Sequence, residues 1–284
     1  MSTSDDFTAY WPAPAKLNLM LRILGRRDDG YHRLQTVFRL LDCGDRLRFR
    51  VRDDGRVSRV NRLAGVPESE DLVVKAAHLL QRHSDSRWGV DIYIDKQLPL
   101  GGGLGGGSSD AATTLVALNT LWQCGIEEDE LARLGLSLGA DVPVFVRGRS
   151  AWGEGVGEAL QPLELPETCY LVIMPSCHVS TAGIFSDPDL TRNSPPIKIR
   201  DFLAGSVAND CLPVVCRRYP EVAEAIEWLG QYAEARLTGT GAAIFAEFDE
   251  MAQALQTQKA VPERYGAFVA RGVNRSPLLR MVDR

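Results

Sequence analysis

Residues 99–110 read Pro99-Leu100-Gly101-Gly102-Gly103-Leu104-Gly105-Gly106-Gly107-Ser108-Ser109-Asp110, and six of the seven positions from 101 to 107 are glycine. Glycine loses more conformational freedom on folding than any other residue, so this concentration indicates positive φ angles or a ligand lying against bare backbone. A strand pattern precedes the stretch and a helical pattern follows it. A helix N-terminus offers unpaired N–H groups and about half a positive charge, which suits a phosphate. We predict a phosphate-binding loop, with a flexible glycine-rich turn as the alternative.

Two common phosphate loops do not fit this stretch. A Walker A loop requires G-x-x-x-x-G-K-[ST], and no lysine follows these glycines. The dinucleotide pattern G-x-G-x-x-G is present at Gly101, Gly103 and Gly106. A Rossmann unit also needs an acid about 20 residues further on, at the end of the next strand. The acids at that distance, Glu127 and Glu128, open a predicted helix, which disfavours the dinucleotide interpretation.

The overall composition is that of an ordinary globular protein with a slight negative charge. The chain has 284 residues, 32 Lys and Arg against 37 Asp and Glu, and a formal net charge of −5. It therefore lacks the long-range positive field that nucleic-acid-binding proteins use, which argues against DNA or RNA as the main partner. The length corresponds to two domains or one large domain. Backbone dipoles bind phosphates without a basic surface, so a phosphate ligand remains compatible with the acidic balance.

The cysteines and the hydropathy pattern indicate a compartment. The six cysteines are scattered without any C-x-x-C pair, which argues against a zinc site or a disulfide scaffold and favours reduced, buried thiols. Residues 1–16 carry acids and no apolar core, so we expect no signal peptide. No window approaches the roughly 18 apolar residues of a membrane helix. We expect a soluble, cytoplasmic protein that does not bind membranes.

Apolar periodicity predicts elements on both sides of the glycine loop. Alternation predicts strands over 15–24, 47–51 and 90–94. In the first of these, Lys16 and Asn18 share the face opposite Leu17 and Leu19. Helical spacing predicts helices over 71–80, 111–122 and 127–138, and an apolar run predicts a short strand over 144–146.

The second half of the chain shows the same mixture of elements. Strands are predicted over 170–174, 242–248 and 267–272, and helices over 220–233 and 249–257. Strands and helices alternate without regular βαβ units, which favours an α+β fold. Pro162 and Pro166 bracket a short acidic segment. We therefore expect a domain boundary there, with domains of residues 1–163 and 164–284.

Two further stretches, together with the glycine loop, resemble the motifs of the GHMP small-molecule kinases. They are Pro14-Ala15-Lys16-Leu17-Asn18-Leu19 and Leu237-Thr238-Gly239-Thr240-Gly241-Ala242, and the similarity extends from Trp11 to nearly the C-terminus. The resemblance implies a two-domain architecture. An N-terminal ribosomal-protein-S5-like α/β domain would pack against a ferredoxin-like α+β domain, with the site in the cleft between them.

Three smaller blocks resemble one branch of that family. They are Asp29-Gly30-Tyr31-His32, Leu138-Gly139-Ala140-Asp141-Val142-Pro143-Val144-Phe145 and Asn209-Asp210. This resemblance implies ATP-dependent phosphorylation of the 2-hydroxyl of 4-diphosphocytidyl-2-C-methyl-D-erythritol, in the non-mevalonate pathway to isoprenoid precursors. Within the family, a kinase of mevalonate or homoserine is the alternative, but those substrates carry no base for Tyr31 and His32. Another alternative is a non-catalytic nucleotide-binding protein, against which Lys16 and Asp141 argue.

The resemblance also assigns catalytic and nucleotide-binding residues. Asp141 would take the hydroxyl proton as general base, and Lys16 would keep that carboxylate ionised and offset developing negative charge. By position alone, Asp141 could be a turn residue and Lys16 a surface lysine. The ATP-binding residues would be Pro99, Leu100, Gly101, Gly102, Gly103, Leu104, Gly105, Gly106, Gly107, Ser108, Ser109 and Lys96. For Lys96, a merely solvated side chain is the alternative.

The acceptor site and the metal complete the expectations. The resemblance implies that Tyr31, His32 and Phe185 hold the cytosine, although Phe185 alone reads as a core residue. The other expected substrate contacts are Asn18, Thr181, Gly239 and Thr240, with Asn209 and Asp210 as lesser candidates. ATP is expected with Mg²⁺, for which no acidic cage stands out, so no protein ligand is assigned. The assembly is expected to be a monomer or a weak homodimer.

Overall fold

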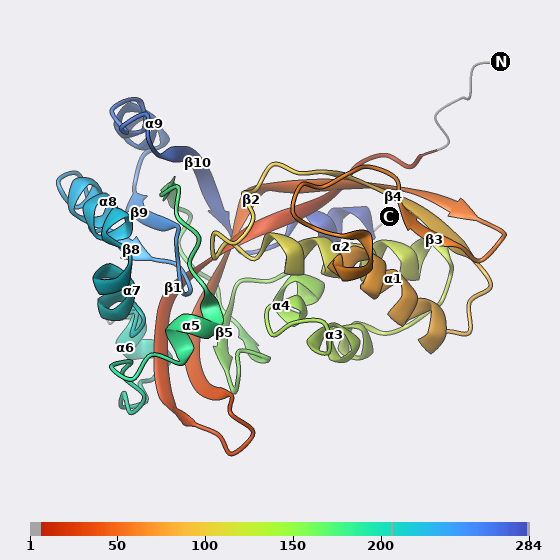
Figure 1. The fold of residues 1–284 in the computed structure, drawn as a ribbon, viewed down its shortest axis with the longest axis horizontal. Coiled ribbons are helices and arrows are strands. Elements are labelled where there is room, and N and C mark those ends of the chain that lie inside the picture. Colours follow the sequence, from red (N-terminus) through yellow and green to blue (C-terminus); the bar gives the residue numbers. More distant parts are fainter. Residues whose placement is uncertain (1–6, 206, 283–284) are drawn as a thin grey trace.

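Two long antiparallel strands, β1 (Trp11–Arg26) and β2 (His32–Arg52), connect the two halves of the molecule (Figure 1). The computed structural model describes residues 7–205 and 207–282; residues 1–6, on which the expectation about a signal peptide partly rests, lie outside this range. The strands pair from Trp11–Leu47 at one end to Arg26–His32 at the hairpin. The predicted strands 15–24 and 47–51 lie within β1 and β2 and are confirmed.

The sequence pattern did not predict the first part of β2 as a strand, because this part is buried on both faces. Val37, Phe38, Leu40 and Leu41 are all buried, and Arg39 between them is also fully buried. A strand covered on both faces loses the apolar–polar alternation that reveals a half-exposed strand. The guanidinium of Arg39 donates to backbone or side-chain oxygens of segments 166, 272 and 274, so it ties β2 to the C-terminal half.

A single mixed sheet extends through both halves in the described part of the chain. Its other strands are β3 (Val57–Arg59), β4 (Gly89–Asp95), β5 (Ala151–Glu154), β6 (Ala159–Pro162), β7 (Cys169–Met174), β8 (Arg236–Leu237), β9 (Ile244–Phe248) and β10 (Gly266–Val273). The order is β3-β4-β2-β10-β7-β9-β8, with β1 and β5 also paired to β2, and β6 to β5. Strand β10 joins the halves, because it pairs with β2 at one end and with β7 along its length.

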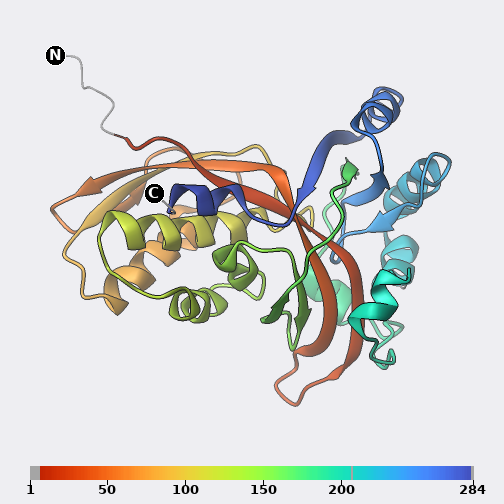
Figure 2. The same ribbon diagram turned by 180° about the vertical axis from the view of Figure 1, so that it is seen from behind.

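Helices cover this sheet separately in each half (Figures 1 and 2). The N-terminal half has α1 (Leu72–His83), α2 (Gly106–Leu121), α3 (Glu128–Leu136), α4 (Val142–Arg147) and the short turn η1 (Glu68–Glu70). The C-terminal half has α5 (Thr181–Phe185), α6 (Ile199–Leu203), α7 (Leu212–Arg218), α8 (Pro220–Gly230) and α9 (Met251–Lys259). The mixture confirms the α+β class, and the longer predicted helices and strands are confirmed with ends shifted by a few residues.

The predicted strand over 144–146 is wrong, because these residues belong to helix α4. Every residue from Val142 to Val146 is buried, so the run shows no periodicity that separates a buried strand from a buried helix. Pro143 stands in the first turn, where its missing N–H has no intrahelical partner to lose. Gly148, with φ +59°, ends the helix.

Each half has its own hydrophobic core, and a third cluster joins them. The N-terminal core packs α1 and α2 on β4, and the C-terminal core packs α7 and α8 on β7 and β9. Leu17 and Met20 of β1 meet Tyr170 and Phe245 in the joining cluster. The final turn, η2 (Pro277–Met281), returns to the N-terminal half, where Leu278 enters its core (Figures 1 and 2). No helix among the described residues is long and apolar enough to span a membrane.

Candidate active site

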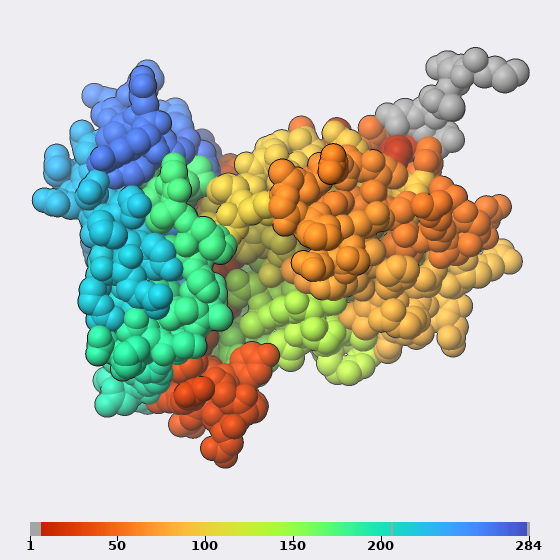
Figure 3. Space-filling model, in the orientation of Figure 1, coloured from red at the N-terminus to blue at the C-terminus, as the bar shows by residue number. Residues whose placement is uncertain are grey.

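A cavity of about 720 Å³ lies between the two halves, in the hollow that Figure 3 shows above the β1–β2 hairpin. This volume is in the range of small-molecule sites. Both halves contribute to its lining, with residues from β1, β2, the glycine loop, the start of α4, α5 and the segment 239–240. The expected residues that line it are Lys16, Asn18, Tyr31, His32, Gly103, Gly105, Ser108, Asp141, Thr181, Phe185, Gly239 and Thr240.

A buried lysine and a half-exposed aspartate form an ion pair on the wall of this cavity. Lys16 Nζ lies 3.1 Å from Asp141 Oδ2, and the two side chains are 4% and 32% exposed. Lys16 is therefore not a snorkelling surface lysine. Asp141 precedes the first residue of α4, but its carboxylate makes no capping hydrogen bond to that helix. It is free to pair with Lys16 and to face a ligand.

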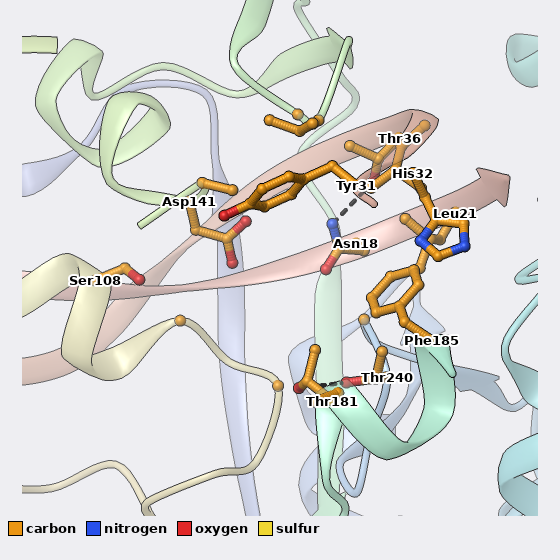
Figure 4. Close-up of a pocket in the computed structure, with 18 of the residues that line it drawn as sticks. Asn18, Leu21, Tyr31, His32, Thr36, Ser108, Asp141, Thr181, Phe185 and Thr240 are labelled. Carbon is orange, nitrogen blue, oxygen red and sulfur yellow. Dashed lines mark hydrogen bonds between the residues drawn. The ribbon is translucent and has the colours of Figure 1, made fainter. Parts of the chain in front are cut away.

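A chain of hydrogen bonds orients the partner of Lys16 on β1. Thr36 Oγ1 donates to the carbonyl of Met20 (2.6 Å), so it must accept from Asn18 Nδ2 (2.8 Å; Figure 4). This leaves Asn18 Oδ1 to accept from Lys16 Nζ at 2.5 Å. Asn18 and Asp141 thus engage two of the three N–H donors of Lys16. The third is available to a ligand in the cavity that Lys16 lines.

The glycine loop is held between β1 and the second glycine motif. The N–H of Lys16 donates to the carbonyl of Leu104, and the N–H of Ala243 donates to the carbonyl of Gly102. Gly103 has φ +76°, and a Cβ there would lie 2.8 Å from the carbonyl oxygen of Thr238. Only glycine allows both this conformation and this approach. Helix α2 begins directly after Gly105, so its free N–H groups are presented next to the cavity.

Several residues expected to bind ATP do not line this cavity. Leu104 and Ser109 are buried, and Leu100 is exposed. Ser109 directs its hydroxyl into the protein, where the described residues give it no partner. The others outside the lining are Pro99, Gly101, Gly102, Gly106, Gly107 and Lys96.

Lys96 is occupied by two carboxylates behind the loop. Its Nζ lies 2.6 Å from Asp45 Oδ2 and 2.8 Å from Asp110 Oδ2, and both acids are buried. These carboxylates outweigh the effect of burial and raise the pKa of Lys96. Burial raises the pKa of Asp110 to about 7. The charge of Lys96 lowers this pKa, and the charge of Asp45 raises it further. No local pattern indicates this cluster, because its members come from three distant segments.

Aromatic residues also line the cavity. Tyr31 is 64% exposed, whereas His32 is 8% exposed and stacks on Phe185 with ring centroids 5.1 Å apart (Figure 4). Burial lowers the pKa of His32, and the nearby Arg192 and Arg26 lower it further.

Other candidate residues lie on or behind the wall of the cavity. Thr181 and Thr240 both line it and share a hydrogen bond of 2.9 Å. Asn209 and Asp210 do not line it but bond to backbone groups: Asn209 Nδ2 donates to the carbonyl of Gly239, and Asp210 Oδ2 accepts from the N–H of Ile23. Both therefore support the segments that carry the site.

The fold and the composition of this cavity are those of a small-molecule kinase. The family model described as GHMP kinases N terminal domain matches residues 71–149, and the one described as GHMP kinases C terminal matches residues 200–267. The chain belongs to the GHMP kinase family, which confirms the resemblance on which the expected fold rested. ATP is the co-substrate that membership in this family implies.

Named relatives indicate the branch. The 4-diphosphocytidyl-2-C-methyl-D-erythritol kinase of Pseudomonas aeruginosa (strain LESB58) is 58% identical over 272 residues, which are 96% of each chain. The kinase of that name from Halorhodospira halophila (strain DSM 244 / SL1) is 57% identical over 273 residues, 95% of each chain. A crystal structure of 4-(cytidine 5'-diphospho)-2C-methyl-D-erythritol kinase, 32% identical, matches with a TM-score of 0.81 over 93% of this chain and 99% of that one.

Proposed function

We propose that this kinase transfers the γ-phosphoryl group of ATP to the 2-hydroxyl of 4-diphosphocytidyl-2-C-methyl-D-erythritol, a step of the non-mevalonate pathway to isoprenoid precursors. The observation that carries the proposal is a single cavity that joins three features. These are the Lys16–Asp141 pair, the glycine loop with the first turn of α2, and the aromatic group of Tyr31, His32 and Phe185. The relatives named for this substrate support it.

Asp141 is the proposed general base. Its carboxylate takes the proton of the 2-hydroxyl while the hydroxyl oxygen forms a bond to the γ-phosphorus and the bond from that phosphorus to the β–γ bridging oxygen breaks. ADP leaves with the bridging oxygen. Phosphoryl transfer of this kind depends chiefly on positioning and charge stabilisation. The 32% exposure of Asp141 on the cavity wall allows the substrate to reach it.

Lys16 is proposed to act on both the base and the transferred group. Its ammonium lies 3.1 Å from the carboxylate of Asp141 and attracts it electrostatically. The N–H donor that neither Asn18 nor Asp141 uses would point to an oxygen of the reacting phosphoryl group. Charge developing there is stabilised most by a donor already fixed in place.

The glycine loop is the proposed phosphate site, with Mg²⁺ carried by ATP. Among residues 7–205 and 207–282, no group of three or more His, Cys, Asp or Glu is placed to hold a metal ion. Mg²⁺ in kinases is held largely by phosphate oxygens and water, and Ser108 adds a hydroxyl oxygen on the cavity wall. The site is therefore compatible with Mg²⁺, which would neutralise charge on the phosphates.

The proposed acceptor site holds the cytosine between aromatic side chains. Tyr31 is exposed and lines the cavity, as an unpaired stacking platform would. Phe185 and His32 border the same space, with Thr181 and Thr240 below them in Figure 4. A nucleobase-linked acceptor uses all of these groups, whereas mevalonate and homoserine carry no ring to stack on them.

A coupled assay of ADP release with Mg²⁺ and ATP tests the proposal. We expect turnover with 4-diphosphocytidyl-2-C-methyl-D-erythritol, and rates with mevalonate, homoserine and no acceptor at least a hundredfold lower. Faster turnover of mevalonate or homoserine would assign the chain to another kind of GHMP kinase. Absence of acceptor-dependent ADP release, with ATP still bound, would favour a non-catalytic nucleotide-binding protein.

Three further properties stay with this proposal. We propose that residues 1–163 and 164–284 form the two domains, with residues 277–281 packed back on the first. We propose the cytoplasm, where ATP is available, as the compartment of the reaction. A monomer or a weak homodimer is the proposed assembly, which sedimentation at several concentrations would test.

A further inference from the structure

The side chain of Arg192, in the loop after α5, contacts both His32 and Phe185 of the aromatic group. Its Nε donates to His32 Nε2 at 3.2 Å, and its Nη2 donates to the carbonyl of Phe185 at 2.9 Å. The same guanidinium also donates to the carbonyls of Asp187 and Leu190. Arg192 does not line the cavity itself. It contacts the ring nitrogen of His32 and the backbone carbonyl of Phe185.

The bond to Arg192 decides which nitrogen of His32 carries the proton. A guanidinium has donors and no acceptor, so His32 Nε2 must accept with its lone pair. The imidazole is then neutral, with its proton on Nδ1. Burial lowers the pKa of the ring and so disfavours a second proton, and the charges of Arg192 from the loop and Arg26 from β1 act in the same direction. Among residues 7–205 and 207–282, only Arg192 forms a side-chain hydrogen bond with this ring, and His32 lines the cavity.

The same guanidinium contacts both of the residues whose rings stack. The rings of His32 and Phe185 are 5.1 Å apart with an interplanar angle of 28°. His32 belongs to β2 and Phe185 to α5, so the spacing of the two rings depends on the contacts between these elements. Arg192 contacts both, and its planar fork fixes its donors relative to one another.

We propose that Arg192 is a positioning residue for the acceptor site: it holds His32 as a neutral Nδ1–H donor, stacked on Phe185, so that the ring offers one donor to an acceptor atom of the bound nucleobase. This inference rests on the proposed function for the identity of the ligand. The geometry of Arg192, His32 and Phe185 stands without it.

The test compares R192Q with R217Q in the full chain. Arg217 pairs with Asp187 and Asp189 and so contacts the same loop, but it touches neither ring. Steady-state kinetics give KM for ATP, KM for 4-diphosphocytidyl-2-C-methyl-D-erythritol, and kcat. Nitrogen-15 labelling of histidine gives the protonation of each ring nitrogen by NMR, and the chain has four histidines, so an H32Q spectrum assigns His32.

The kinetics and the spectra can each contradict the inference. We expect R192Q to raise KM for the cytidyl substrate about tenfold, with KM for ATP and kcat within twofold of wild type, and R217Q to change none of them. Equal changes in both KM values, or no change, would overturn the inference. In wild type we expect a His32 spectrum with Nδ1 protonated and Nε2 accepting, and R192Q should lose it; protonated Nε2 in wild type would also overturn the inference.

The spectra separate this inference from the proposed function. If wild type does not turn over the cytidyl substrate, the proposed function fails, but the spectra still show whether Arg192 fixes His32. If R192Q does not fold, R192K replaces it. Lysine keeps the charge but has no planar fork to reach His32 and Phe185 together, so R192K should raise the same KM, and an unchanged value would count against the inference.

Discussion

Lys16 Nζ and Asp141 Oδ2 lie 3.1 Å apart, although one residue belongs to strand β1 and the other precedes helix α4. The lysine side chain is almost fully buried, and burying a charge is costly unless it is paired and hydrogen-bonded. Asp141 and Asn18 satisfy this requirement on the protein side. The pair is therefore stable without ligand, and it is already assembled where the proposed phosphoryl transfer takes place.

Replacement of Asp141 by asparagine should abolish most turnover without loss of ATP binding. The asparagine side chain would keep the shape of the aspartate but could not take a proton, and general base catalysis contributes about 10²–10⁴ in rate. Coupled ADP-release kinetics and calorimetric titration with ATP would measure the two effects. Asp129→Asn, at an exposed ion pair with Arg147, is the matched control. Turnover near that of wild type in D141N would exclude Asp141 as the general base.

Replacement of Tyr31 by alanine should weaken the cytidyl substrate selectively. The ring is 64% exposed, so its loss leaves no core cavity and should not lower the melting temperature. Stacking of a base on an aromatic side chain contributes about 1–3 kcal/mol, which predicts a KM for the cytidyl substrate raised about five- to 150-fold. KM for ATP should stay within twofold. Tyr232→Ala, another exposed tyrosine, is the control, and a parallel rise of both KM values in Y31A would contradict the stacking role.

Replacement of Gly103 by alanine should displace the glycine loop. The residue has φ +76°, and a Cβ would lie 2.8 Å from the carbonyl oxygen of Thr238 and 3.0 Å from that of Gly241. We expect KM for ATP to rise at least tenfold and the melting temperature to fall. Gly125→Ala separates the causes, because Gly125 has φ +67° with nothing within 4 Å of a Cβ. It should lower stability by about 1 kcal/mol and leave the kinetics unchanged; equal kinetic effects in both variants would refute the steric explanation.

The buried carboxyl of Asp110 should make stability decrease with pH. Burial raises its pKa to about 7, from about 3.9 in the unfolded chain. The folded state therefore binds this proton more tightly, and its stability falls as pH rises from about 4 to about 7. Asp110→Asn removes the titration, so the drop in melting temperature between pH 5 and pH 8 should be smaller than in wild type. An equal drop would show that Asp110 is ionised throughout this range.

Local patterns were sufficient for the elements in which polar and apolar residues alternate or follow a helical period. The alternation around Lys16 and Asn18 placed both on one side of β1, where the structure has them. It failed for the start of β2 and for α4, because an element buried on all sides carries no polar stripe to reveal its period. The pairing of β10 with both β2 and β7 could not be predicted from local patterns either, because strand partners that are distant in the chain leave no periodic signal.

Residue types and local spacing were enough to identify the glycine loop, the strand that carries Lys16 and the likeness to GHMP kinases. Backbone conformation at glycine and alternation along a strand are local properties, so the linear order of residues contains them. The 3.1 Å pair of Lys16 and Asp141, the capture of Lys96 by Asp45 and Asp110, and the hold of Arg192 on His32 and Phe185 depend instead on the packing of distant segments. Such contacts form when the hydrophobic cores bring these segments together, and no short stretch of the chain encodes them alone.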